Sequence, residues 1–166
     1  MTNKILIDGW NVAWKIDDIR ESIPEDLPKA RTKLNSRVKS FFSGKKSQFK
    51  IIYDGKSGMR SEENYVRGID IQFSKDPEKA DHLIIKFLRS QHSARQWTVI
   101  TSDRTLSAHA RSLGASVISS ETFIEKLAVD HGEIPTHYKH NPQLNGEEIK
   151  FWMEQFHADK KKEGDP

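Results

Sequence analysis

Short, mostly apolar runs recur along the chain, and three of them end at an aspartate. Residues 5–7 lead into Asp8, residues 49–53 into Asp54, and residues 97–102 into Asp103. Runs of this kind are typical of strands in a parallel sheet that is covered on both faces. Because such sheets bind ligands outside the carboxyl ends of their strands, the three acids are expected at one edge, where a cation would hold them together. The pattern therefore predicts a metal-dependent site.

Between these runs, apolar positions recur at helical spacing. Residues 27–42 carry an apolar stripe opposite a basic face, and Gly44 is expected to end that helix. Asp76 and Pro77 predict the start of a second helix, because a capping side chain is followed by proline at the first helical position. Two more helices are expected, at residues 105–113 and 120–127.

Two further strands complete the predicted sheet. Residues 69–73 alternate with period 2 and predict a less buried strand near a sheet edge, and residues 115–118 predict a fifth strand. The polar segment 15–26 is expected to be a loop or a broken helical turn, and the charged segment 55–64 a loop. Since strands and helices alternate, the fold class is α/β: a three-layer sandwich with a central, mainly parallel sheet.

The C-terminal part of the chain has a different pattern. We expect one domain over residues 1–128, followed by an extension over residues 129–166 whose end is charged and disordered. A capping box at residues 145–148 predicts one accessory helix. Its apolar stripe is expected to pack on the domain or on a second copy of the chain, as a monomer or weak homodimer; the stripe comprises Ile149, Trp152, Met153 and Phe156.

Charge is unevenly distributed along the 166 residues, although the net charge is only +3. Ten basic residues lie between Lys29 and Arg60, and the only acid among them is Asp54. Such an excess favours a polyanionic partner, because neutralised phosphates supply much of the affinity for nucleic acids. The alternative is a solvated helix face that acids elsewhere balance.

The chain has no cysteine, which excludes disulfides and thiol catalysis and fits a reducing compartment. No stretch approaches the about 20 apolar residues of a membrane span. The first residues enter a strand without a signal-peptide pattern, so we expect a cytoplasmic protein.

Four acids carry the predicted chemistry: Asp8, Asp54, Asp81 and Asp103. Magnesium prefers oxygen ligands, and carboxylates that converge without an ion would repel one another. Each acid also has a structural explanation. Asp103 could cap a helix, Asp8 and Asp54 could end strands in turns, and Asp81 could be a solvated helix acid. If the three strands that precede Asp8, Asp54 and Asp103 are parallel neighbours, one shared site is the better explanation.

Other polar and aromatic residues near these acids have two interpretations each. Asn11 could orient a ligating carboxylate or contact a phosphate, or it could be a turn residue. Trp10 could stack on a base, although packing is the more common role at such a position. His82 is expected on a helix surface. A metal cluster of His131, His137 and His140 is a minor alternative.

Four motifs in this order resemble the NYN domain, in its YacP-like branch of the PIN-like nuclease superfamily. They are ILIDGWN at residues 5–11, IIYDG at 51–55, KAD at 79–81 and VITSD at 99–103. The similarity covers about residues 3–128. It implies an acidic pocket that binds Mg²⁺ or Mn²⁺ and an endonuclease that cleaves RNA, which in one branch is messenger RNA on the ribosome.

Carried over position by position, the resemblance assigns Asp8, Asp54, Asp81 and Asp103 to the acidic pocket and Asn11 to the polar position of the first motif. Trp10 stands where tyrosine is usual. His82 stands where many relatives have another acid, which would weaken a second metal site.

The leading hypothesis is a metal-dependent endoribonuclease acting on single-stranded or ribosome-associated RNA. Asp8, Asp54 and Asp103 would hold the metal, and Asp81 would complete the pocket. Asn11 would orient a ligand or the substrate. The residues expected to guide the phosphate backbone are Arg37, Lys39, Lys56 and Arg60.

Three other functions compete with this hypothesis. A non-catalytic RNA-binding module would keep the fold and cleave nothing. A nucleotide-using Rossmann enzyme would need a glycine-rich loop after the first strand, where the chain has only Gly9. A phosphatase with an aspartyl nucleophile would need a second acid two residues after Asp8, where the chain has Trp10.

Overall fold

One sheet of six strands, in the order β3-β4-β2-β1-β5-β6, forms the centre of the fold. The structure is a computed structural model that describes residues 3–55, 65–66 and 69–130. The chain divides into a compact unit, Met1–Glu133, and a second unit, Ile134–Pro166. The second unit lies outside the described residues. So do the predicted accessory helix, the residues His131, His137 and His140, and two of the residues predicted to bind the substrate, Lys56 and Arg60.

Five of the strands run parallel: β1 (Asn3–Asp8), β2 (Ser47–Tyr53), β4 (Ile69–Phe73), β5 (Trp97–Ile100) and β6 (Ser116–Ile118). The two-residue strand β3 (Tyr65–Val66) pairs antiparallel with β4 and forms the edge. The predicted α/β class with a mainly parallel sheet is confirmed. The sequence pattern did not predict β3.

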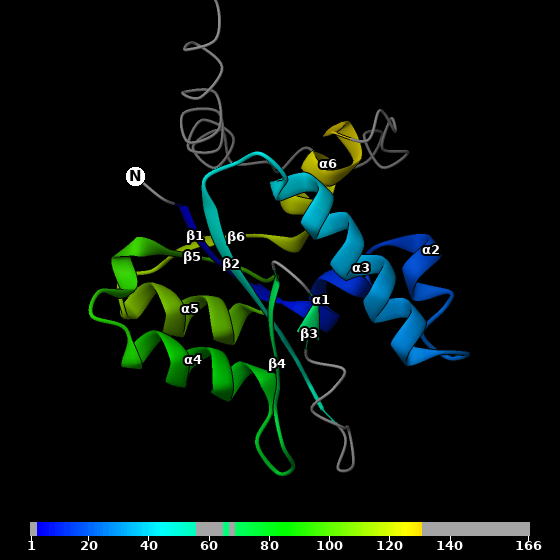
Figure 1. The fold of residues 1–166 in the computed structure, drawn as a ribbon. Helices are drawn as coiled ribbons and strands as arrows, with labels where there is room; N and C mark the ends of the chain where they lie inside the picture. Colours follow the sequence, from blue (N-terminus) through cyan, green and yellow to red (C-terminus); the bar gives the residue numbers. More distant parts are fainter. Residues whose placement is uncertain (1–2, 56–64, 67–68, 131–166) are drawn as a thin grey trace, which may run out of the picture. The chain divides into compact units, whose positions relative to one another are not determined.

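Helices cover both faces of the sheet (Figure 1). One face carries α4 (Ala80–Ser90) and α5 (Arg104–Ser112), which contact each other. The other face carries α1 (Gly9–Ala13), α3 (Leu27–Phe42) and α6 (Ser120–Asp130), and α2 (Asp17–Arg20) packs on α3. A 3-10 turn, η2 (Ala94–Gln96), precedes β5. Among the described residues, no helix has the length and apolar character needed to cross a membrane.

The core follows from the strand periodicity. Leu6 of β1 packs in one apolar cluster with Ile52 and Val99, on the side where α4 and α5 lie. Its neighbours Ile5 and Ile7 point to the opposite face and are also buried. Because both faces of β1 are covered, its apolar run is continuous rather than alternating.

The predicted helix at residues 27–42 has the expected bounds. The Asp26 side chain accepts a hydrogen bond of 2.9 Å from the backbone N–H of Lys29, and proline occupies the first turn. Gly44, just beyond the end, has a φ of +75°, which glycine adopts without strain. Local sequence signals therefore determine both ends of α3.

The predicted start of the second helix at Asp76 and Pro77 is wrong. The helix begins at Ala80, after a turn in which the N–H of Glu78 donates to the Lys75 carbonyl at 2.7 Å. The Ala80 N–H donates instead to the carboxylate of Asp54, which is 26 residues away. A residue that is distant in the sequence caps this helix, so the local capping pattern gave the wrong position.

Candidate active site

Three adjacent parallel strands bring the predicted acids to one edge of the sheet. β1 lies between β2 and β5, with Asp8 opposite Ile52 and Ile7 opposite Ile100. Asp54 follows Ile52 by two residues, and Asp103 follows Ile100 by three. The strands are therefore the parallel neighbours that a shared site requires.

Asp8 is half-buried, and its surroundings disfavour the charged form of its carboxyl group. Burial raises the pKa of its carboxyl group from 3.8 to about 6, and the negative charges of Asp54 and Asp103 act in the same direction. A hydrogen bond from the Thr101 hydroxyl to Asp8 Oδ2, 3.0 Å long, opposes the rise. A carboxylate in this position would be stabilised by a bound cation.

Asp54 is exposed and also has a structural role. Its Oδ1 accepts hydrogen bonds from the Ala80 N–H at 2.5 Å and from the Ser74 hydroxyl at 3.2 Å. The first of these bonds holds the N-terminus of α4 against the end of β2. Asp81 lies in this first turn, and its Oδ1 accepts a bond of 2.8 Å from the N–H of His82, which is exposed. The Asp54–Ala80 bond thus brings Asp81 to the same edge.

Asp103 caps α5. Its Oδ1 accepts a hydrogen bond of 2.7 Å from the N–H of Leu106. The capping role considered from the sequence is therefore present, but it uses one carboxylate oxygen. Because a carboxylate has two oxygens, capping is compatible with a role at the edge.

Thr101 connects two of the acids and was not predicted from the sequence. Its side chain donates to Asp8, as described above, and accepts a hydrogen bond of 3.1 Å from the Asp103 N–H. Only 1% of the residue is exposed. The signal in the sequence is a hydroxyl residue two positions before Asp103, at the end of an apolar strand.

Asn11 holds three segments together. Its Oδ1 accepts hydrogen bonds from the Ser102 N–H at 2.9 Å and from the Ser120 hydroxyl at 2.7 Å. These bonds connect α1 to the segment after β5 and to the start of α6. They also fix the plane of the amide, so that the orientation of its nitrogen is set by the fold.

Glu121, in the first turn of α6, is another acid near the edge that was not predicted. It accepts a hydrogen bond from the Ser102 hydroxyl and forms an ion pair of 2.6 Å with Lys15. Burial raises the pKa of Glu121, but the hydrogen bonds from Lys15 and Ser102 outweigh burial, and the net pKa is lowered. Since Lys15 already neutralises it, Glu121 differs from Asp8.

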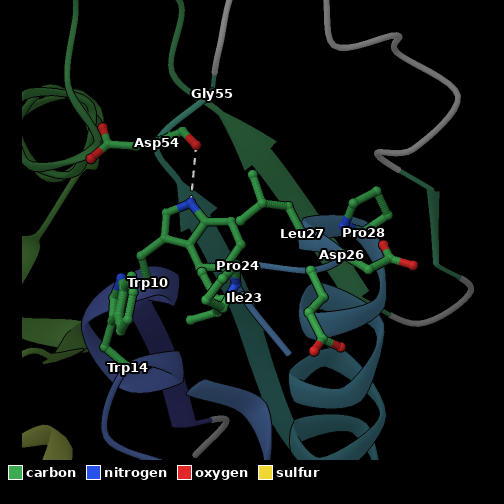
Figure 2. Close-up of a pocket in the computed structure, with 10 residues that line it drawn as sticks. Trp10, Trp14, Ile23, Pro24, Asp26, Leu27, Pro28, Asp54 and Gly55 are labelled. Carbon is green, nitrogen blue, oxygen red and sulfur yellow. Dashed lines mark hydrogen bonds between the residues drawn. The ribbon is translucent and has the colours of Figure 1, made fainter. Parts of the chain in front are cut away.

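A pocket of about 780 Å³ opens beside Asp54 (Figure 2). Trp10 forms one wall. Its Nε1 donates a hydrogen bond of 3.0 Å to the backbone carbonyl of Asp54. Its ring packs edge-on against the Tyr53 ring, with 5.1 Å between the ring centroids. Trp10 therefore packs on the domain, as the commoner interpretation held, and also lines a cavity.

Part of the basic segment is neutralised within the domain. Arg37 forms an ion pair of 2.8 Å with Asp18, and the buried Lys50 pairs with Asp70 at 2.8 Å. Lys39 of α3 is exposed. The count of ten basic residues therefore overstates the positive charge that is free to attract a polyanion.

The described residues contain no group of three or more Asp, Glu or His side chains placed to hold a metal ion together. The donor chemistry nevertheless fits a hard divalent cation, because the edge presents carboxylate oxygens and the charges that act on Asp8 are negative. Mg²⁺ usually keeps several waters and needs only one or two direct carboxylates.

Comparisons with known proteins bear on the family and the fold of the chain. The model of the YacP-like NYN domain matches residues 5–163, and this match continues beyond residue 128 into the C-terminal extension. The crystal structure of Rae1 (YacP) from Bacillus subtilis superposes with a TM-score of 0.67 at 18% identity, covering 96% of this chain and 86% of that chain. A mutant form of the same protein gives a TM-score of 0.65 at 20% identity, covering 80% and 78%.

The comparison with curated proteins gives no match. At these identities the two solved structures support the fold alone, whereas the family match spans nearly the whole chain. The chain belongs to the YacP-like NYN domain family, within the PIN-like nucleases.

Proposed function

We propose that this protein is a metal-dependent endoribonuclease that cleaves single-stranded or ribosome-associated RNA. The observation that carries the proposal is the delivery of Asp54, Asp8 and Asp103 to one edge by three adjacent parallel strands. The raised pKa of Asp8, to which the charges of the other two contribute, supports a cation at this edge. Membership of a PIN-like nuclease family supports phosphodiester cleavage.

Asp8, Asp54 and Asp103 would hold Mg²⁺ or Mn²⁺, with water completing the ligand set. Such an ion, when bound, supplies an activated water and stabilises negative charge that develops at phosphorus. Thr101 keeps Asp8 oriented and favours its ionised form through their hydrogen bond. The capping bonds to Ala80 and Leu106 hold the other two carboxylates in place.

The remaining residues would act on the substrate. Asp81, in the first turn of α4, would complete the acidic pocket and position water. Asn11 would direct its amide nitrogen at a phosphate or a ligand, because its oxygen is already held by Ser102 and Ser120. The residues that would guide the phosphate backbone are Lys39, Lys56 and Arg60, with Arg37 joining them where a phosphate replaces Asp18 as its partner.

One observation favours a second function, RNA binding without cleavage. Within the part of the chain that the structure describes, no three acids come together as a metal-binding group, and Asp54 and Asp103 each use one oxygen to cap a helix. A module of this kind would keep the fold and the basic surface and would lack turnover.

The test is cleavage of end-labelled single-stranded RNA by the purified protein, with Mn²⁺ or Mg²⁺ and with EDTA. We expect internal cleavage that requires the metal and is lost in Asp8→Asn. Asp17→Asn is the matched control, because Asp17 is an exposed acid paired with Arg20 on α2. Cleavage that survives in Asp8→Asn would contradict the proposed site. Binding without cleavage, on free RNA and on ribosome-bound messenger alike, would assign the second function.

A further inference from the structure

We propose that the pocket beside Asp54 holds one unpaired nucleobase of the RNA strand, next to the phosphate at the acidic edge. This inference rests on the proposed function, because it places the base relative to the reacting phosphate. The pocket is the cavity shown in Figure 2, and a volume of about 780 Å³ lies within the range of small-molecule sites.

Three segments build the pocket. α1 and its C-terminal end supply Trp10 and Trp14, and the backbone after β2 supplies Asp54 and Gly55. The connection from α2 into α3 supplies the remaining lining residues, which are Ile23, Pro24, Glu25, Asp26, Leu27 and Pro28. The walls are therefore mainly aromatic and apolar, with carboxylates among them.

Trp10 is held in one orientation before any ligand binds. The bond from its Nε1 to the Asp54 carbonyl fixes one edge of the indole, and Tyr53 packs against it. Tyr53 is itself fully buried, and its hydroxyl donates to Asn35 Oδ1 at 2.7 Å. A rigid aromatic wall loses little entropy when a flat ring stacks on it.

Trp14 lies one helical turn after Trp10, and its backbone N–H donates a hydrogen bond of 3.0 Å to the backbone carbonyl of Trp10. It is 50% exposed, and no other large apolar side chain among the described residues is exposed. Residues four positions apart lie on the same side of a helix, and both indoles line the pocket. Each offers an aromatic surface of the kind on which unpaired bases stack.

The charges in the pocket favour a base over a phosphate. Glu25 and Asp26 are exposed acids at the pocket, and Asp26 is fixed by its bond to the Lys29 N–H. Carboxylates repel phosphate, and they accept hydrogen bonds from the amino groups of adenine, cytosine and guanine. Uracil has no amino group and is expected to bind more weakly than the other bases.

Asp54 connects the pocket to the acidic edge. Its backbone carbonyl holds Trp10 at the pocket wall (Figure 2), while its carboxylate accepts a hydrogen bond from the first N–H of α4. A base in the pocket therefore places its own backbone beside the carboxylates. An arginine side chain of a peptide would also suit an aromatic and acidic pocket. A peptide, however, gives no reason for the pocket to lie next to the acidic edge, whereas a nucleotide has both a base and a phosphate to place.

The test measures binding in EDTA, so that cleavage plays no part. Fluorescence anisotropy would give the RNA affinities of three proteins: wild type, Trp14→Ala and Trp14→Phe. The ligands are short labelled oligonucleotides of adenine, the same length of uracil, and adenine oligonucleotides with one abasic site at each position in turn. We expect Trp14→Ala to weaken adenine binding about tenfold and Trp14→Phe to retain most of the affinity, because stacking on each base is substantial. Trp14 is half exposed, so both variants should fold, which circular dichroism would check.

The decisive result is whether the Trp14→Ala substitution and an abasic site in the RNA act independently on the affinity. In wild type, an abasic site at one position should cause a loss similar to that of Trp14→Ala, and the two losses should not add when combined. Additive losses, or equal affinity of wild type and Trp14→Ala, would overturn the inference. So would a loss of affinity for an arginine-containing peptide with RNA binding unchanged. Coupling in a protein that never cleaves RNA would refute the proposed enzyme and leave the base pocket standing.

Discussion

The hydroxyl of Thr101 donates a hydrogen bond of 3.0 Å to the carboxylate of Asp8, across the boundary between β5 and β1. This bond favours the ionised form of a carboxyl group whose pKa burial raises to about 6. Thr101 also accepts the N–H of Asp103, and it thereby connects two acids from adjacent strands.

Thr101→Val should raise the pKa of Asp8 further, because the bond that lowers it is lost. The rise in RNA cleavage with increasing pH should therefore move to higher pH, whereas Thr101→Ser should behave like wild type. The Val variant should also lose about 1–3 kcal/mol of stability, since the Asp103 N–H loses its acceptor. Rates measured from pH 5 to 9, with thermal melts, check both effects; an unmoved pH profile in Thr101→Val would argue against this role.

Asp8→Asn should stabilise the metal-free protein, and more at pH 8 than at pH 4.5. The folded pKa of about 6 lies above the ordinary 3.8, so the folded state binds the proton more tightly and loses stability as pH rises through this window. The full penalty above pH 6 is at most about 3 kcal/mol. Thermal melts in EDTA measure the gain, and Asp17→Asn is the control. A gain that is equal at both pH values would contradict the shifted pKa.

Asp54→Ala and Asp54→Asn should differ in stability. The alanine variant loses the acceptor of the Ala80 N–H and should lose about 1 kcal/mol, as removed helix caps do. The asparagine variant keeps an oxygen acceptor and should melt close to wild type. Both variants lose the charge and should lose cleavage. If Asp54→Ala had the same melting temperature as wild type, the capping of α4 by Asp54 would contribute nothing to stability.

Gly9→Ala should be strongly destabilising, because a Cβ at this position would lie 2.4 Å from the ring of Tyr53. That ring is buried and held by Asn35, so the backbone between Asp8 and Trp10 must move. We expect a loss of about 2–3 kcal/mol and weaker RNA binding. Gly44→Ala is the comparison: nothing lies within 4 Å of its added Cβ, and only the φ of +75° opposes the substitution. Denaturant melts should rank Gly9→Ala well below Gly44→Ala.

Lys39→Glu should weaken RNA binding and flatten its dependence on salt, since the slope follows the number of neutralised phosphates. Lys39 is exposed on α3, whereas Arg37→Glu would also break the ion pair with Asp18. Lys86→Glu on α4 serves as the control of equal charge change, on the other face of the sheet. Lys86 is exposed, and its ion pair with Glu78 is 3.8 Å long, which at the surface contributes little to stability. RNA-binding titrations at increasing salt concentration give the slope of affinity against salt for each variant. If this slope were the same for Lys39→Glu and Lys86→Glu, the face of α3 that carries Lys39 would not guide the RNA backbone.

Local patterns in the sequence determined the strands and most helices. The apolar runs before Asp8, Asp54 and Asp103 identified three strands, because a strand covered on both faces is mostly apolar rather than alternating. Asp26 and Gly44 marked the ends of α3, since capping depends on neighbours within a few residues. The motifs around the acids also sufficed for the family.

Only the tertiary structure decided how these elements work together. Thr101 and Asp8 are 93 residues apart, and Asn11 and Ser120 are 109 apart, so their bonds depend on strand order and helix placement. Neighbouring residues do not encode such pairs. The same reason explains why the start of α4 was misplaced: its first N–H is satisfied by Asp54 from β2's end rather than by Asp76. The pocket of Trp10 and Trp14 likewise exists because three segments that are separate in the sequence meet beside Asp54.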